Sequence, residues 1–288
     1  MHIAGLLLAA FCLVAPMSAS AEIRQTCPNP DALGVARVVE IDASGGPWFG
    51  APHGDRDFLA PGEVVLTFDD GPVPRSTRPI LAALAAQCTS ATFFMVGEMA
   101  GEHLDVVKEV TEQGHTIGTH TWSHLNLKRL PDDKMKLQIE AAFTAIEKAA
   151  GAPIAPFFRY PYLSSSDASV AYLQSRNVAQ FAIDIDSFDW RSRNASSIVH
   201  RVMSTLEQHG RGIILLHDIY PSTAAAVPLL LKELKIKGYK VVHMRSAVAA
   251  QTLAGFDPPG KEAKQGEKVI RRVRIHPKTR VTSKWQAW

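Results

Sequence analysis

Two histidines that lie four residues apart, His120 and His124, are among the first side chains in this sequence that could do chemistry. One turn of helix there would put both rings on one side, at a separation that suits a single metal ion. Chance is the alternative, because the chain contains 11 histidines. Two adjacent carboxylates, Asp69 and Asp70, follow an apolar run and precede a Gly-Pro pair. That pattern is also ordinary turn chemistry, in which Asp70 caps the next segment.

One carboxylate and two histidines together offer three ligands to a metal ion. Such a set leaves a coordination position for water, which is typical of a catalytic zinc site rather than a structural one. Cobalt or nickel would also suit these nitrogen and oxygen donors. The same donors hold iron in non-haem oxygen chemistry, so that enzyme class is an alternative. The sequence therefore predicts one divalent metal ion, zinc first, in a site open to substrate.

These side chains must be positioned by the elements around them, and from Glu63 onward strand-like and helix-like stretches alternate. The predicted strands cover residues 63–69, 91–96, 115–119, 155–159, 178–184, 211–217 and 239–244. The predicted helices cover residues 77–87, 103–113, 132–150, 168–176, 195–209 and 223–237. Seven strands in this alternation predict an α/β fold with a parallel sheet, either doubly wound or closed into a barrel.

Polar residues gather at the carboxyl ends of the predicted strands, where parallel α/β proteins of either architecture place their sites. They are Asp69, Asp70, His120, Arg159, Asp184, Asp186 and His217. His217 ends a run of isoleucines and leucines, and an apolar strand gains nothing from a histidine in packing. These strand ends therefore predict a single functional site.

The clearest helix, 132–150, has an apolar stripe on one face. Its members are Met135, Ile139, Phe143, Ile146 and Ala150. Asp132 is expected to cap its start and Gly151 to end it.

Composition is that of a globular protein with a substantial core, since 46% of the 288 residues are hydrophobic and 20% are charged. The formal net charge is +3, but residues 255–288 hold nine Lys or Arg and three Asp or Glu. The chain before this basic tail is mildly acidic. It has no basic footprint for nucleic acid.

The N-terminus resembles an export signal, because a short apolar run from Ile3 to Ala15 precedes the small residues Ala19-Ser20-Ala21. Cleavage after Ala21 would leave no transmembrane span and would send the protein to the periplasm or medium. Two cysteines, Cys27 and Cys88, would then remain in an oxidising compartment, where a disulfide is favoured over two separate thiols. The predicted regions are a signal peptide at 1–21, an extended Pro- and Gly-rich arm at 22–62, a catalytic domain at 63–250 and a basic, flexible tail at 251–288.

Five motifs occur in an order that resembles the polysaccharide deacetylases with the NodB homology domain, carbohydrate esterase family 4. They are Thr67-Phe68-Asp69-Asp70-Gly71-Pro72, His120-Thr121-Trp122-Ser123-His124, Arg159-Tyr160-Pro161-Tyr162, Asp186-Ser187-Phe188-Asp189-Trp190 and Leu215-Leu216-His217. The resemblance covers about residues 63–245 and implies a distorted (β/α)7-type barrel. It also implies a metal-dependent hydrolase that removes acetyl groups from the amides or esters of a polysaccharide.

Residue by residue, the resemblance implies that Asp70, His120 and His124 hold the metal. Asp69 would be the general base and His217 the general acid. Arg159 would orient Asp69, and Asp189 would support His217. The backbone N–H of Tyr162 would help to hold the oxyanion, and Trp190 and Leu215 would wall the pocket for the acetyl methyl group. Leu163 stands where the family often has Gly, which affects the shape of the substrate groove.

The chemistry of amide hydrolysis leads to the same roles independently of the family. It requires an activated water, a charge partner for the oxyanion and a proton for the leaving nitrogen. A catalytically silent glycan-binding module is a further alternative. Such a module is expected to lack at least one of Asp69, Asp70, His120, His124 and His217, and all five are present. The polymer stays open among peptidoglycan, chitin oligomers, exopolysaccharide and acetylxylan. The basic tail is expected to contact the cell wall or an acidic polysaccharide electrostatically.

Overall fold

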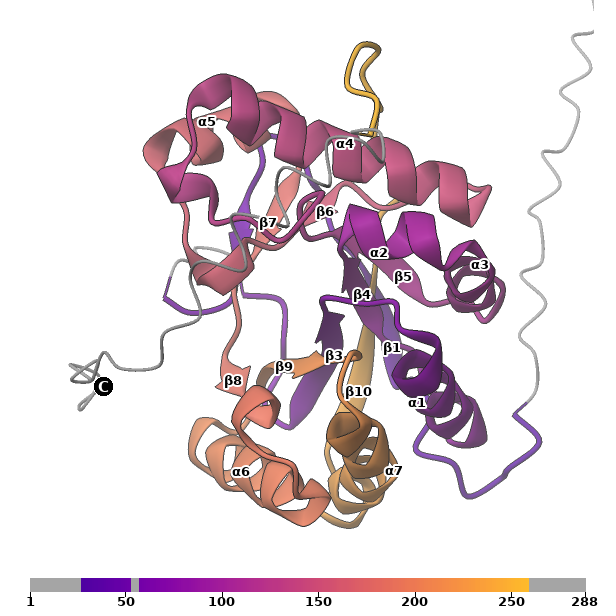
Figure 1. Cartoon of the computed structure of the whole chain (residues 1–288). Coiled ribbons are helices and arrows are strands. Elements are labelled where there is room, and N and C mark those ends of the chain that lie inside the picture. The colour runs from indigo at the N-terminus through magenta and orange to yellow at the C-terminus, as the bar shows by residue number, and fades with distance from the viewer. Residues whose placement is uncertain (1–26, 53–56, 259–288) are drawn as a thin grey trace, which may run out of the picture.

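A buried strand, β3 (Glu63–Asp69), lies at the centre of the sheet in a computed structural model that describes residues 27–52 and 57–258 (Figure 1). It pairs over almost its whole length with β9 (Gly212–His217), and this register sets Asp69 beside His217. On its other edge β3 pairs with β10 (Lys240–Arg245) at its start and with β4 (Thr92–Met95) at its end. The sheet continues through β5 (Thr116–Thr119), β6 (Phe157–Phe158) and β7 (Ala179–Phe181). Every strand pair in the described ranges is parallel, as the alternation predicts.

The strands form the distorted barrel that was expected, with one strand that was not predicted. Within the predicted strand 178–184 only β7 forms, and a further short strand, β8 (Ile185–Asp186), follows just beyond it and pairs with β9 rather than with β7. Arg159 donates to the carbonyls of Phe181 and Ala182 at 3.4 and 3.2 Å. The guanidinium thus provides hydrogen bonds for backbone carbonyls between β7 and β8, where the two strands do not pair with each other. These bonds explain how the barrel tolerates the missing strand pairing.

Successive side chains of each strand point to opposite faces, so the barrel has an interior column and an exterior one. On β3, Val65 packs in the interior cluster, whereas Val64, Leu66 and Phe68 belong to the cluster beneath the helices. The interior column of β3 therefore rises from Val65 to Asp69. The matching column of β9 rises through Leu215 to His217, so apolar interior residues lead to polar ones at the carboxyl ends.

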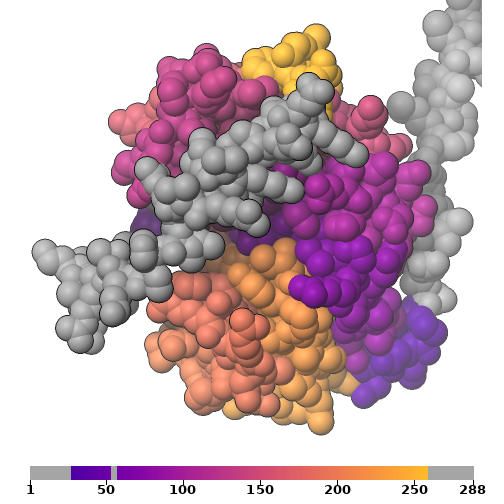
Figure 2. Space-filling model, viewed as in Figure 1, coloured from indigo at the N-terminus to yellow at the C-terminus, as the bar shows by residue number. Residues whose placement is uncertain are grey.

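The N-terminal arm joins the sheet at two edges. Its strands β1 (Arg37–Glu40) and β2 (Trp48–Phe49) pair with β10 and β7. Four arm residues are buried in the same cluster as the barrel interior, and they are Ile41, Ala43, Phe49 and Leu59. A disulfide joins Cys27 to Cys88 just after the first helix, as favoured from the sequence, and the start of the arm lies on the surface beside that helix (Figure 2). The arm thus completes the core of the barrel rather than lying loosely on it.

Helices surround the barrel and connect its strands (Figure 1). They are α1 (Pro74–Ala86), α2 (Gly97–Glu102), α3 (Leu104–Glu112), α4 (Asp132–Ala150), α5 (Asp167–Ser175), α6 (Ala195–His209) and α7 (Pro221–Ile236). All six predicted helices are present within a few residues of their expected bounds, and α2 was not predicted. Within the described ranges, no helix combines the length and apolar character that crossing a bilayer requires.

For helix α4, the predicted C-terminal end is confirmed and the predicted N-terminal cap is wrong. Its predicted apolar stripe is buried and Gly151 ends the helix at a φ of 64°, where glycine is unstrained. The predicted cap Asp132 is instead the first helical residue, and Pro131 takes the cap position without a side-chain hydrogen bond. The predicted signal peptide, and residues 259–288 of the predicted tail, lie outside the described residues.

Candidate active site

The carboxyl ends of the strands surround a pocket of about 430 Å³. Eight of the predicted site residues line it, and they are Asp69, Asp70, His120, His124, Tyr162, Trp190, Leu215 and His217. The other two, Arg159 and Asp189, are fully buried behind the pocket wall. The structure therefore brings all ten predicted residues together. Tyr160, Leu163, Asp186 and Tyr220 complete the lining.

Three of these residues form a candidate metal centre. Oδ1 of Asp70 lies 3.1 Å from Nε2 of His124 and 3.4 Å from Nε2 of His120. One ligand atom from each residue lies within 4.8 Å of the others. Oδ1 of Asp70 is buried, and among the described residues it accepts no well-aligned hydrogen bond. A buried carboxylate oxygen without a donor, facing two imidazole nitrogens, fits a divalent cation.

The protonation states of these residues also suit a cation. His120 Nδ1 is 2.7 Å from the carbonyl of Arg159, so it carries the hydrogen and Nε2 keeps its lone pair toward Asp70. Burial lowers the pKa of His120 to about 4, so the ring is neutral at physiological pH. Burial opposes ionisation of Asp70, but the close approach of His124 and the charges of His124 and His120 outweigh it and lower its pKa.

The segment that carries the two histidines differs from the expected turn of helix. Thr121 and His124 have φ angles of 68° and 56°, so the chain bends through left-handed positions between the rings. The carbonyls of Thr121 and Trp122 accept from the first amides of α2, and the amide of Trp122 donates to Gln138 in α4. These long-range backbone bonds, rather than a local helix, bring His124 back toward His120.

The adjacent carboxylates reach one pocket because the chain turns at the second of them. Asp69 points into the barrel by strand alternation, whereas Asp70 would point outward if the strand continued. Asp70 instead has a φ of 77°, a left-handed conformation that turns its side chain to the pocket. Both neighbouring carboxylates therefore line the same pocket.

A residue that the sequence analysis missed, Asp218, holds this turn. Its amide donates to the carbonyl of Asp69 at 3.3 Å. Its carboxylate accepts from the amide of Gly71 at 3.0 Å and from the hydroxyl of Thr77 at 2.6 Å. Asp218 is only 1% exposed, and burial raises its pKa to about 7. Its position directly after His217 at a strand end was the available signal.

Asp69 is held apart from the three candidate ligands by Arg159. Its Oδ1 accepts from Nη1 of Arg159 at 2.7 Å, and the same nitrogen donates to Thr67 at 2.7 Å. Its Oδ2 lies 3.9 Å from Nε2 of His120. The guanidinium carbon of Arg159 lies 4.3 Å from the ring centre of Phe94, and this stacking fixes the plane of the guanidinium group. One carboxylate oxygen is thus tied to Arg159 and the other faces the metal centre.

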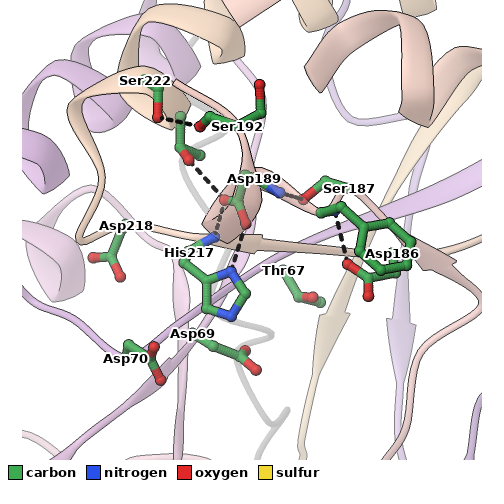
Figure 3. Close-up of polar contacts among 12 residues, drawn as sticks. Thr67, Asp69, Asp70, Asp186, Ser187, Asp189, Ser192, His217, Asp218 and Ser222 are labelled. Atoms are coloured by element: carbon green, nitrogen blue, oxygen red, sulfur yellow. Dashed lines mark hydrogen bonds and ion pairs between the residues drawn. The ribbon is translucent and has the colours of Figure 1, made fainter. Parts of the chain in front are cut away.

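His217 lies beside Asp69 at the end of the neighbouring strand, and Asp189 lies on the far side of its ring from Asp69 (Figure 3). Nδ1 of His217 is 2.7 Å from Oδ1 of Asp189, and the His217 amide donates to Oδ2 at 2.7 Å. The hydroxyl of Thr223, which the sequence analysis missed, donates to the same Oδ2 at 2.6 Å. Burial lowers the pKa of His217, but the hydrogen bond and charge of Asp189 outweigh it and raise the pKa to about 9. The other edge of the ring faces Asp69 and Asp70.

The pocket rim is apolar. Tyr162 and Trp190 are 67% and 46% exposed, whereas Leu215 is nearly buried in the pocket wall. Tyr162 and Leu163 both have left-handed backbones, with φ angles of 61° and 50°. The family often has glycine at the position of Leu163, and a left-handed backbone is the conformation that glycine adopts without strain. The leucine therefore keeps the turn and adds a side chain to the rim.

A parallel α/β barrel with a candidate metal centre, a separately held carboxylate and a histidine–aspartate pair is an arrangement that suits a hydrolase. Comparison with known proteins is more specific, because the model of the family described as polysaccharide deacetylase matches residues 59–181. The peptidoglycan-N-acetylmuramic acid deacetylase PdaC of Bacillus subtilis is 36% identical over 181 residues, covering 62% of this chain and 37% of that protein. A peptidoglycan-N-acetylglucosamine deacetylase of Bacillus cereus is 33% identical over 184 residues, covering 62% and 84%.

A comparison with solved structures also finds a peptidoglycan deacetylase. The peptidoglycan deacetylase Bd3279 of Bdellovibrio bacteriovorus matches with a TM-score of 0.67 at 34% identity, covering 74% of this chain and 59% of that one. The chain belongs to the polysaccharide deacetylase family, as its five motifs predicted. It spans 37% of the length of PdaC and 59% of the solved chain of Bd3279.

Proposed function

We propose that the protein is a metal-dependent hydrolase that removes acetyl groups from an acetylated polysaccharide, with peptidoglycan as the first substrate to test. The observation that carries the proposal is the separation of three functions within one pocket. Asp70 and the two histidines form a candidate metal centre, Asp69 is held by Arg159, and His217 is held by Asp189. The peptidoglycan deacetylases among its relatives support this choice of polymer.

Asp70, His120 and His124 would hold one divalent ion, with zinc as the expected metal and cobalt or nickel as possible replacements. When bound there, the ion would lower the pKa of a water and place positive charge beside the developing oxyanion. The neutral state of His120 is the ligand form that such an ion needs.

Asp69 acts as the general base, because its free oxygen faces the metal centre while Arg159 fixes the other. His217 acts as the general acid, because its raised pKa keeps the ring protonated at neutral pH. Asp189 holds the Nδ1 proton, so the Nε2 proton is the one directed at the pocket and available to the leaving nitrogen. The two residues stand on neighbouring strands in register, so base and acid would both reach a substrate bound in the one pocket.

The rim supplies the remaining parts of the site. The backbone N–H of Tyr162 would donate to the oxyanion from a turn that is already in its left-handed conformation. Trp190 and Leu215 would enclose the acetyl methyl group, because they are the apolar side chains beside His217 in the pocket.

The decisive experiment measures acetate release from peptidoglycan, chitin oligomers, acetylated exopolysaccharide and acetylxylan by the metal-loaded protein. Oxygen consumption is followed in parallel, since an iron oxygenase would consume it and a hydrolase would not. The oxygenase alternative gives no role to Asp69 with Arg159 or to His217 with Asp189. Acetate release that His217→Asn abolishes supports the proposal. Binding of glycans without acetate release from any of them would favour the silent glycan-binding module.

A further inference from the structure

A basic surface, formed by the turn between β8 and α6 and by α6 itself, begins at the pocket. Figure 1 shows the path of the chain there. Between Asp189 and Glu207 the chain carries Arg191, Arg193 and Arg201 and no acidic residue. This contrasts with the mildly acidic composition of the chain outside the tail. The surface begins at Trp190, which is itself part of the pocket lining.

Two of these arginines are held in place by aromatic rings. The guanidinium carbon of Arg191 lies 4.2 Å from the ring centre of Trp190 and 5.3 Å from that of Phe188. The guanidinium carbon of Arg201 lies 5.1 Å from the same Phe188 ring. Phe188 is in turn fixed by its amide, which donates to Asp186 at 2.8 Å. Stacking of this kind orders a guanidinium while leaving its N–H groups available.

Neither guanidinium has a carboxylate partner among the described residues. Both side chains are exposed, and neither forms a salt bridge there. Asp186 attracts Arg191 electrostatically, but the two form no ion pair. Some exposed arginines elsewhere in the fold do find acids, as Arg78 does with Asp105 and Glu109. Two ordered and unpaired guanidinium groups beside a glycan pocket form a ready site for an anion.

We propose that Arg191 and Arg201 form a carboxylate-binding subsite, so that the preferred substrate is an acetylated glycan with carboxylates beside the sugar that is deacetylated. The proposal rests on the proposed function and makes its substrate class more specific. Guanidinium groups bind carboxylates in a planar, bidentate manner, and those on aromatic rings lose less conformational freedom on binding. A neutral glycan such as a chitin oligomer would leave both arginines without a partner.

The test compares one N-acetylated oligosaccharide with carboxylate side groups and the same oligosaccharide after those carboxylates are converted to amides. We expect wild-type protein to favour the acidic form in kcat/KM by about 3- to 10-fold at low salt, because exposed charge pairs contribute modestly. The preference should shrink as salt rises from about 0.01 M to about 0.5 M. The ratio is the readout, because Arg191 also supports Trp190 and its loss can change the rate on both substrates.

Variants separate the local site from the overall charge. Arg191→Gln with Arg201→Gln should bring the ratio close to one, and Arg191→Lys with Arg201→Lys should retain part of the preference. The matched control is Lys108→Gln with Lys232→Gln, which removes the same charge from exposed positions on α3 and α7 and should keep the wild-type ratio.

Equilibrium binding of the two oligosaccharides keeps this test independent of catalysis. A binding preference for the acidic form without acetate release would remove the proposed function and leave the carboxylate subsite. Equal binding and equal kcat/KM of the two forms by wild-type protein would overturn the subsite. So would a preference that the double glutamine variant retains.

Discussion

Replacing Asp189 by Asn tests the part of the site that delivers the proton. The buried Asp189 carboxylate accepts from Nδ1 of His217, from the His217 amide and from the Thr223 hydroxyl. It is the main cause of the raised pKa of His217, which without it would be lowered by burial. Asparagine has nearly the same shape, so the substitution removes the charge and one acceptor and leaves the pocket in place.

The magnitude follows from the two protonation states of His217. With a pKa of about 9, the ring is about 97% protonated at about pH 7.5. Without Asp189 the pKa falls to the ordinary value of about 6.5 or lower, and at most about 9% of the rings are protonated at that pH. We therefore expect Asp189→Asn to reduce kcat/KM at about pH 7.5 by at least about 10-fold through protonation alone. An enzyme that depends on a general acid loses activity as the pH rises through the pKa of that acid. The alkaline limb of the pH–rate profile should therefore move to lower pH in Asp189→Asn.

The assay is acetate release from about pH 5 to about pH 10, with metal content measured for each sample. A bound divalent ion lowers the pKa of His217 in both proteins, so the displacement of the limb is compared rather than its absolute midpoint. Asp186→Asn is the matched control, because Asp186 carries the same charge in the same pocket without contacting His217. An alkaline limb that stays in place in Asp189→Asn, or that moves equally in both variants, would refute the role of Asp189.

Three further predictions concern the two adjacent carboxylates, two buried histidines and the basic tail. Asp69→Asn should bind metal normally and lose about 10²- to 10⁴-fold in rate, whereas Asp70→Asn should be inactive and largely metal-free. If metal analysis finds that Asp69→Asn loses the metal and Asp70→Asn keeps it, the roles of the two residues are reversed. Burial lowers the pKa of both His115 and His243 to about 4, below the unfolded value of about 6.5, so unfolding free energies from urea titrations should fall as pH drops across that range, and an equal fall in His115→Asn would contradict this. Deleting residues 258–288 should leave acetate release from a small soluble oligomer unchanged and weaken binding to an acidic polymer at low salt, and equal polymer binding by both proteins would remove the role of the tail.

The ligands and strands were predictable because their signals are local. Asp70 and His120 directly follow the predicted strands 63–69 and 115–119, His124 lies four residues after His120, and strand ends in a parallel fold must meet at one edge. The alternation of strand and helix likewise identified the strands from β3 onward except the two-residue β8, since a buried strand leaves a continuous apolar run. In these cases the residue type and its place at a strand end contained the needed information.

The remaining features depend on bonds between distant parts of the chain. Helix α2 has no side-chain cap, and its first amides bind the carbonyls of Thr121 and Trp122 instead. The left-handed turns at Asp70 and His124 are likewise held from outside, by Asp218 and by Gln138 respectively. No local pattern reports a partner that is supplied more than a hundred residues away, as Asp218 is to Gly71.

The pairing of β1 with β10 joins the two ends of the described chain. Arg37 lies beside Val242 and Glu40 beside Arg245, so the first of the described strands gains its partner only after the last of them has been synthesised. Before that moment, the apolar arm residues that complete the barrel interior have no closed barrel to enter. A chain that stops before β10 would therefore keep both the edge of β1 and this apolar surface open. Synthesis through β10 is thus a condition for burying the surfaces that promote aggregation.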